Sequence, residues 1–194
     1  MPQLDRNDLY SLEQYAEARE DFRAGVIAHK ANRNLKIGDN ATVYFEDQRT
    51  IQYQIQEMLR IEKIFEAPEI QEELDTYNPL IPDGDNLKAT FMIEYTDVEE
   101  RQKMLNILVG IENKLWMQVA DMEKVWAIAD EDLERSDADK TSAVHFVRFQ
   151  FSQEMIDALK NGAKLSAGID HPAYTETVSP VPENIQYSLL QDFA

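Results

Sequence analysis

The sequence predicts an α+β fold with a mostly antiparallel sheet and helices packed over one face. Apolar residues recur at helical spacing in several segments of the first half, which is typical of amphipathic helices. Short segments rich in Val, Ile, Phe, Tyr and Trp follow one another in the second half, and this order indicates antiparallel pairing. A length of 194 residues suits one core, so a single domain over residues 1–194 is expected.

The N-terminal half alternates predicted helices with predicted strands. Ser11 and Gln14 resemble a capping box at the start of the first helix. Pro68 suits the first turn of a third helix, and Asp97 followed by Glu100 is typical of the start of a fourth. The expected elements are helices over 8–32, 49–65, 69–76 and 97–112, strands over 42–45 and 87–95, and a rigid surface loop over 77–85.

The C-terminal half is expected to complete the sheet. Trp116 and Trp126 fall in the two arms of a predicted hairpin, and we interpret them as core residues, with an exposed contact patch as the alternative. Ser152 begins a predicted helix that Gly162 ends. The expected elements are strands over 114–119, 124–129, 142–151, 163–169 and 173–178, a helix from 152, an acidic loop over 130–140 and a short C-terminal helix.

Charge and composition exclude several classes of function. The net charge of -18, from 37 acidic and 19 basic residues, repels phosphate backbones and anionic lipids, so neither nucleic acid nor a membrane is an expected partner. The chain has no Cys, so a redox role would require a centre borrowed from another protein. No apolar signal or spanning segment is apparent, which predicts a cytoplasmic protein. No cofactor motif is evident, and whether the chain is an enzyme stays open.

The densest polar segment runs from 41 to 66, where a predicted strand passes into a predicted helix. Buried polar groups must be paired, so this segment forms either a structural network or a binding site. Its arginines, together with the loop over 77–85, could bind a carboxylate or a phosphate. The alternative is a structural ion-pair network, for which Glu57 and Arg60 are suitably spaced. The candidate ligand-binding residues are Arg49, Tyr53, Glu57, Arg60, Tyr77 and Asn78.

Two histidines are candidates for a metal site. His145 and His171, together with Glu46 or Glu57, would suit a single iron, manganese or zinc ion if the sheet brought them together. His145 shares a strand face with apolar residues, so the alternative is a buried imidazole paired with a carboxylate or carbonyl. His171 precedes Pro172 between two predicted strands, where the alternative is hydrogen bonding that stabilises the turn.

Six runs, spread over nearly the whole chain, carry a resemblance to a known family. They are Leu12–Tyr15, Tyr44–Asp47, Thr50–Arg60, Tyr77–Pro82, Ile128–Asp132 and Asp170–Tyr174. Through them the chain resembles a bacterial family known as domain of unknown function 3501. The resemblance implies no activity. It implies an association, since such proteins are similar to ones encoded beside rubrerythrin-like di-iron proteins and iron-sulfur oxidoreductase subunits.

The resemblance therefore implies a peroxide-defence or electron-transfer setting. Our leading hypothesis is a soluble accessory protein that binds a redox partner, either rubrerythrin-like or an iron-sulfur protein. The binding surface would include the polar helix, the loop over 77–83 and the acidic loop over 130–139. The alternative is a metal-dependent or small-anion-binding enzyme whose site gathers His145, His171, Glu46, Glu57 and Arg60.

Overall fold

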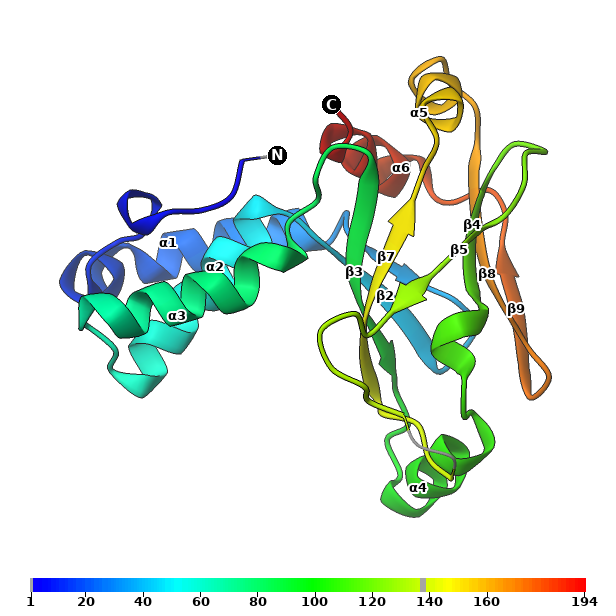
Figure 1. Cartoon of the computed structure of the whole chain (residues 1–194), viewed down its shortest axis with the longest axis horizontal. Coiled ribbons are helices and arrows are strands. Elements are labelled where there is room, and N and C mark those ends of the chain that lie inside the picture. Colours follow the sequence, from blue (N-terminus) through cyan, green and yellow to red (C-terminus); the bar gives the residue numbers. More distant parts are fainter. Residues whose placement is uncertain (1, 137–138) are drawn as a thin grey trace.

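The computed structural model describes residues 2–136 and 139–194, and it confirms the α+β fold. Figure 1 shows two parts. One, which we call the arm, consists of α1 (Leu12–Lys30), α2 (Gln48–Glu62) and α3 (Ala67–Tyr77). The other, the body, contains two antiparallel sheets. None of the described helices has the length and apolar composition that crossing a bilayer requires.

Local sequence signals place the helices of the arm. The capping box of Ser11 and Gln14 begins α1, as predicted, and Pro68 lies in the first turn of α3. The Asp47 side chain accepts a hydrogen bond from the Thr50 backbone and begins α2 immediately after a strand. The arm has a core of its own, because the apolar stripe of α2 packs on α3 and on the segments around it. This core consists of Leu4, Ile51, Ile55, Leu59, Leu74 and Ile81.

The body contains a five-stranded and a four-stranded sheet, and every strand pair is antiparallel. The five-stranded sheet has the order β1 (Asn34–Lys36), β2 (Ala41–Glu46), β3 (Asn86–Ile93), β7 (Val144–Gln150), β6 (Ile128–Ala129). The four-stranded sheet has the order β5 (Val125–Trp126), β4 (Leu115–Val119), β8 (Leu165–His171), β9 (Tyr174–Val178).

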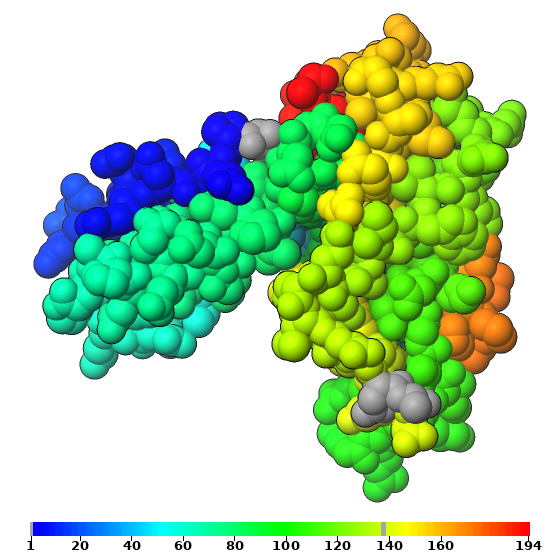
Figure 2. Space-filling view, viewed as in Figure 1, coloured from blue at the N-terminus to red at the C-terminus, as the bar shows by residue number. Residues whose placement is uncertain are grey.

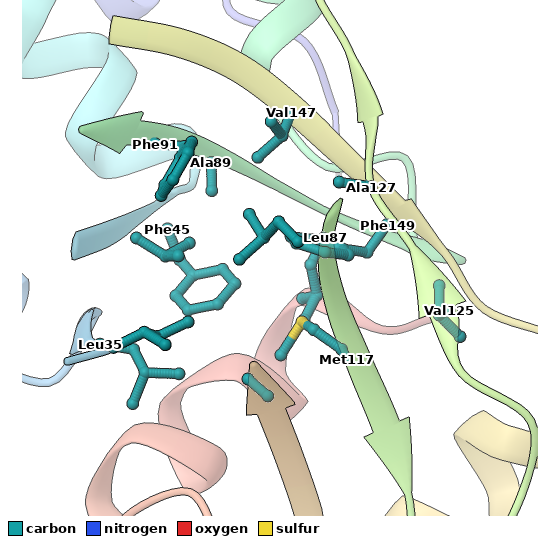
Figure 3. Close-up of a cluster of buried hydrophobic side chains, with 14 of the residues drawn as sticks. Leu35, Phe45, Leu87, Ala89, Phe91, Met117, Val125, Ala127, Val147 and Phe149 are labelled. Atoms are coloured by element: carbon teal, nitrogen blue, oxygen red, sulfur yellow. The ribbon is translucent and has the colours of Figure 1, made fainter. Parts of the chain in front are cut away.

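The main core lies between the two sheets (Figure 3). Phe45, Leu87 and Phe149 from the five-stranded sheet pack with Met117 and Val125 from the other sheet. Side chains alternate across a strand, so the other face of the five-stranded sheet carries the polar residues. That outer face lies on the side of the arm and, as described below, forms part of the candidate site.

Two short helices lie next to α3 of the arm, η1 (Arg6–Asp8) and η2 (Asn78–Leu80). The helices around the sheets are α4 (Val98–Ile107), η3 (Ile111–Lys114), α5 (Gln153–Lys160), α6 (Glu183–Leu189) and η4 (Leu190–Asp192). Buried Arg33 connects α1 to the sheet and the C-terminal segment. Its guanidinium donates to the carbonyls of Phe45 and Glu46 and to Asp192, at 2.5 Å from Nη2 to Oδ2. One charged side chain therefore joins three parts of the molecule.

Three predictions about elements require correction. The helix expected over 97–112 ends at Ile107, because Gly110 turns the chain with a φ of 82° and a 3-10 helix follows. The single strand expected over 124–129 is two short strands that belong to different sheets. The loop expected on the surface over 77–85 is partly buried, since Asn78 and Ile81 are 8% and 2% exposed.

Candidate functional site

A groove of about 890 Å³ lies between the arm and the outer face of the five-stranded sheet. Figure 2 shows the hollow between the two parts of the molecule. One wall is the end of α3 with η2, the floor is formed by β3 and β7, and the other wall is the segment over 131–135. This volume falls within the range of about 300–1,000 Å³ that is typical of binding pockets.

Strand alternation places two cations on the floor of the groove. Leu87 and Phe149 face the core, so Lys88 and Arg148 face the groove, and the strand register sets them directly opposite each other. Like charges in that position destabilise a sheet unless they are neutralised. Asp83 neutralises Lys88 at 2.8 Å, and Glu131 accepts two hydrogen bonds from Arg148, each 2.8 Å long.

A third ion pair forms the wall over 131–135. Arg135 donates to both oxygens of Asp132, at 2.6 and 2.7 Å, and to Asp130 at 3.1 Å. Its guanidinium carbon lies 4.6 Å from the ring centre of Phe146, within the range of a cation–π contact. This stacking holds the wall against β7.

These contacts keep the carboxylates of the groove ionised. Hydrogen bonds from Arg148 and Arg135 hold the pKa values of Glu131 and Asp132 below their usual range. Burial raises the pKa of Asp83, but hydrogen bonds from Lys88 and Asn86 outweigh it, so that pKa is also lowered. The groove therefore presents fixed charges at neutral pH.

Four of the candidate ligand-binding residues lie on α2, and three of them face α1, since the Arg49 guanidinium lies close to Gly25. Glu57 accepts two hydrogen bonds from Arg19, at 2.7 and 2.8 Å, and one from the Tyr15 hydroxyl at 2.7 Å. The Tyr53 ring packs against Phe22 with ring centres 6.2 Å apart. Glu57 is thus part of a structural ion pair between two helices, whereas its spacing in the sequence had suggested Arg60, on the same helix, as its partner. Arg49 and Arg60 are exposed.

The other two candidates follow α2 in the chain and have different surroundings. Tyr77 is half-buried and lines the groove. The buried Asn78 side chain accepts from the backbone N–H of Leu4 and donates to the carbonyl of Leu4, both at 2.9 Å. Asn78 therefore anchors the N-terminal segment, and Tyr77 is the member of the set placed in the groove.

The metal candidates have separate partners. His145 is fully buried, as expected, with Nδ1 2.6 Å from Asp130 and Nε2 2.9 Å from the Thr141 hydroxyl. His171 contacts the carbonyl of Val109 at 3.2 Å and accepts from the backbone N–H of Ala173 at 3.1 Å. Glu46 accepts from the hydroxyls of Thr50 and Thr90. In the described part of the chain, no group of three or more acidic or histidine side chains is placed to hold a metal ion.

Of the two tryptophans, one is buried, but on the outer face of the four-stranded sheet and not in the core between the sheets. Trp116 is 4% exposed, and Trp126, opposite it on the neighbouring strand, is 44% exposed. The Lys124 ammonium lies 4.0 Å from the ring centre of Trp116 and forms an ion pair with Asp170. Lys124 therefore lies over both tryptophan rings on the outer face of the four-stranded sheet.

Comparison with known proteins identifies the family. The model of a family described as a protein of unknown function (DUF3501) matches residues 3–193. The chain belongs to this family. The 1.90 Å crystal structure of a protein of unknown function from Burkholderia pseudomallei is 50% identical to this DUF3501 chain, covers 100% of both chains and gives a TM-score of 0.94. No curated protein matches.

Sequence reasoning missed Asp130, which connects the groove wall of this DUF3501 chain to the sheet. Asp130 has a φ of 55°. Its carboxylate accepts a backbone hydrogen bond from β7 that a neighbouring strand would otherwise accept. One oxygen accepts from the Phe146 N–H at 3.2 Å, and the other contacts His145. The signal was available in the sequence, because a buried histidine requires a partner and an acidic loop precedes its strand.

Proposed function

We propose that this chain is an accessory protein that binds a protein partner of a redox or peroxide-defence system. The observation that carries the proposal is the groove between the arm and the five-stranded sheet, with a volume of about 890 Å³. Two loops that the sequence suggested for partner binding, around Tyr77 and around Asp132, contribute its opposite walls. The redox setting rests on the resemblance to proteins encoded beside rubrerythrin-like and iron-sulfur proteins.

The charges in the groove favour recognition over proton transfer. General acid–base catalysis is most effective when the pKa of the catalytic group lies near the working pH. The pKa values of Glu131, Asp132 and Asp83 are instead lowered, and hydrogen bonding to carboxylates raises those of Arg135 and Arg148. Groups that keep one charge state across the neutral pH range are suited to binding a partner of complementary charge in a fixed orientation.

The proposal is tested by binding measurements with the candidate partners. The untagged protein is mixed at low salt with the proteins encoded beside its gene, among which the resemblance implies rubrerythrin-like and iron-sulfur proteins, and association is measured by calorimetry. Thr76, an exposed residue of the groove wall, is changed to Trp to fill the groove, and Thr96→Trp adds the same bulk at an exposed site after β3.

We expect at least one neighbouring protein to bind the wild type and the Thr96→Trp variant, and to bind the Thr76→Trp variant more weakly. If none of them binds the wild type, the accessory role is wrong. Equal binding to the two Trp variants would place the interface outside the groove.

A further inference from the structure

In each of the three ion pairs in which both residues line the groove, the carboxylate is the outer member. The cations emerge from the floor and wall with their stems packed, while their partners lie nearer to solvent. Side-chain exposure is 61% for Asp83 against 11% for Lys88, 51% for Glu131 against 24% for Arg148, and 55% for Asp132 against 17% for Arg135. A ligand entering the groove therefore meets carboxylate oxygens first.

All three donor nitrogens of Arg148 and the two terminal nitrogens of Arg135 already have acceptors. Arg148 uses Nε and Nη2 on Glu131 and donates from Nη1 to the Gln150 amide oxygen at 2.7 Å. Arg135 donates to Asp132 and to the carbonyl of Leu133 at 2.9 Å. An incoming anion would have to displace bidentate carboxylate contacts, which are among the stronger hydrogen bonds in proteins.

Two further carboxylates add negative charge to the groove. Asp75 and Asp85 are exposed and accept hydrogen bonds from the amides of Gln71 and Asn86, at 2.8 and 3.0 Å. Amide donors leave the carboxylate charge in place. The lining thus has five acidic residues against three basic ones, on a chain whose net charge is -18. Both the local and the overall field attract cations.

The groove also offers apolar surface from several elements. Tyr77, Pro79 and Leu80 lie on one wall and Phe146 on the floor. Aromatic and aliphatic anchors surrounded by charge are typical of protein interfaces. A simple polyamine would leave this apolar surface unused, whereas a peptide segment would cover it.

We infer that the groove binds a basic segment of the partner protein, in which Lys or Arg side chains alternate with apolar ones. The basic side chains contact the outer carboxylates, and the apolar ones cover the surface around Tyr77 and Phe146. This inference rests on the proposed function and names the chemistry of the partner.

The test uses a short fluorescent peptide that alternates Lys with Leu and Phe, and a matched peptide with Glu in place of Lys. Binding is followed by fluorescence anisotropy at low salt and at about 150 mM salt. The test variant, Asp83→Asn/Glu131→Gln/Asp132→Asn, neutralises the three outer carboxylates. The control variant, Glu17→Gln/Glu20→Gln/Asp21→Asn, removes the same charge from exposed positions on α1.

We expect the Lys peptide to bind, and the test variant to weaken its binding by about tenfold at low salt, because it removes three exposed charge contacts. The control variant should change the dissociation constant by less than about twofold, and the Glu peptide should not bind. A second variant, Asp75→Asn/Asp85→Asn, keeps all three ion pairs, so it gives the same direction of change without risk to folding.

Several results would overturn the inference. These are equal weakening in the test and control variants, binding of the Glu peptide, or spermidine binding as tight as that of the Lys peptide. The two proposals fail separately. If the Lys peptide binds through the groove but no neighbouring redox protein does, the accessory role is wrong and the inference stands. If a redox protein binds wild type and test variant equally, the role stands and the inference is wrong.

Discussion

The ion pair that joins α1 to α2 yields a stability prediction. Hydrogen bonds from Arg19 lower the pKa of Glu57 from its ordinary value of 4.5 to about 2. A tenfold change in proton affinity corresponds to ~1.4 kcal/mol, so the ionised carboxylate stabilises the folded chain by up to ~3 kcal/mol. Because the Arg19 side chain is 32% exposed, solvent screening reduces this to ~2 kcal/mol. Glu57→Gln keeps the size and one acceptor for Tyr15 but removes the charge.

The sign of the pH dependence follows from the lowered pKa. The stabilisation is fully present above pH 4.5 and is lost as the pH falls through the folded pKa of about 2. Urea unfolding followed by circular dichroism should show Glu57→Gln less stable than wild type by ~2 kcal/mol near neutral pH, with the difference shrinking at low pH. Glu17→Gln, at an exposed position of α1, is the control. A loss below ~0.5 kcal/mol, or one that stays constant with pH, would refute the reasoning.

Three further predictions concern packing and cooperativity. Arg33→Met leaves the buried Asp192 carboxylate without its cation and should cost ~3–5 kcal/mol in urea unfolding, and a loss under ~1 kcal/mol would contradict this account. Gly168→Ala places a Cβ 2.4 Å from the Trp116 ring and 2.6 Å from the backbone carbonyl of Glu176, so we expect a loss of ~1–3 kcal/mol and a changed near-ultraviolet circular dichroism spectrum. An unchanged melting temperature would contradict this expectation. We also expect the cores of the arm and body to unfold together as one domain, whereas two calorimetric transitions would show that they are independent.

Elements with signals in their own sequence were predicted well, and elements defined by distant partners were not. The cap at Ser11 and the proline at Pro68 are local, and the helices they begin were expected close to their observed bounds. The strand β1 has three residues and no periodicity, so it was missed. The change of sheet at Ala127 depends on which strands lie on either side, and a run of apolar residues holds no information about that.

The candidate site shows the same division. The loops around Tyr77 and Asp132 were expected to bind a partner, and they line one groove. Lys88 and Arg148 were overlooked because each is an ordinary polar residue in a strand that alternates polar and apolar side chains. That they lie directly opposite each other becomes clear only when the register of β3 and β7 is known. Glu57 seemed suited to a partner on its own helix, but Arg19 on α1 offers a bidentate contact that sequence spacing cannot predict.

The charge that the groove presents depends on backbone position more than on composition. Lys88 and Arg148 rise from a sheet, where neighbouring side chains cover their stems, while Asp83 and Glu131 come from loops at the edge and lie above them. The loop residues therefore determine which sign of charge a partner meets. A change such as Glu131→Lys would leave four acidic against four basic residues in the lining and keep the floor of the groove in place. Loops also tolerate substitution better than strands do, so we expect the charges at the rim of this groove to vary among DUF3501 members more than its floor does.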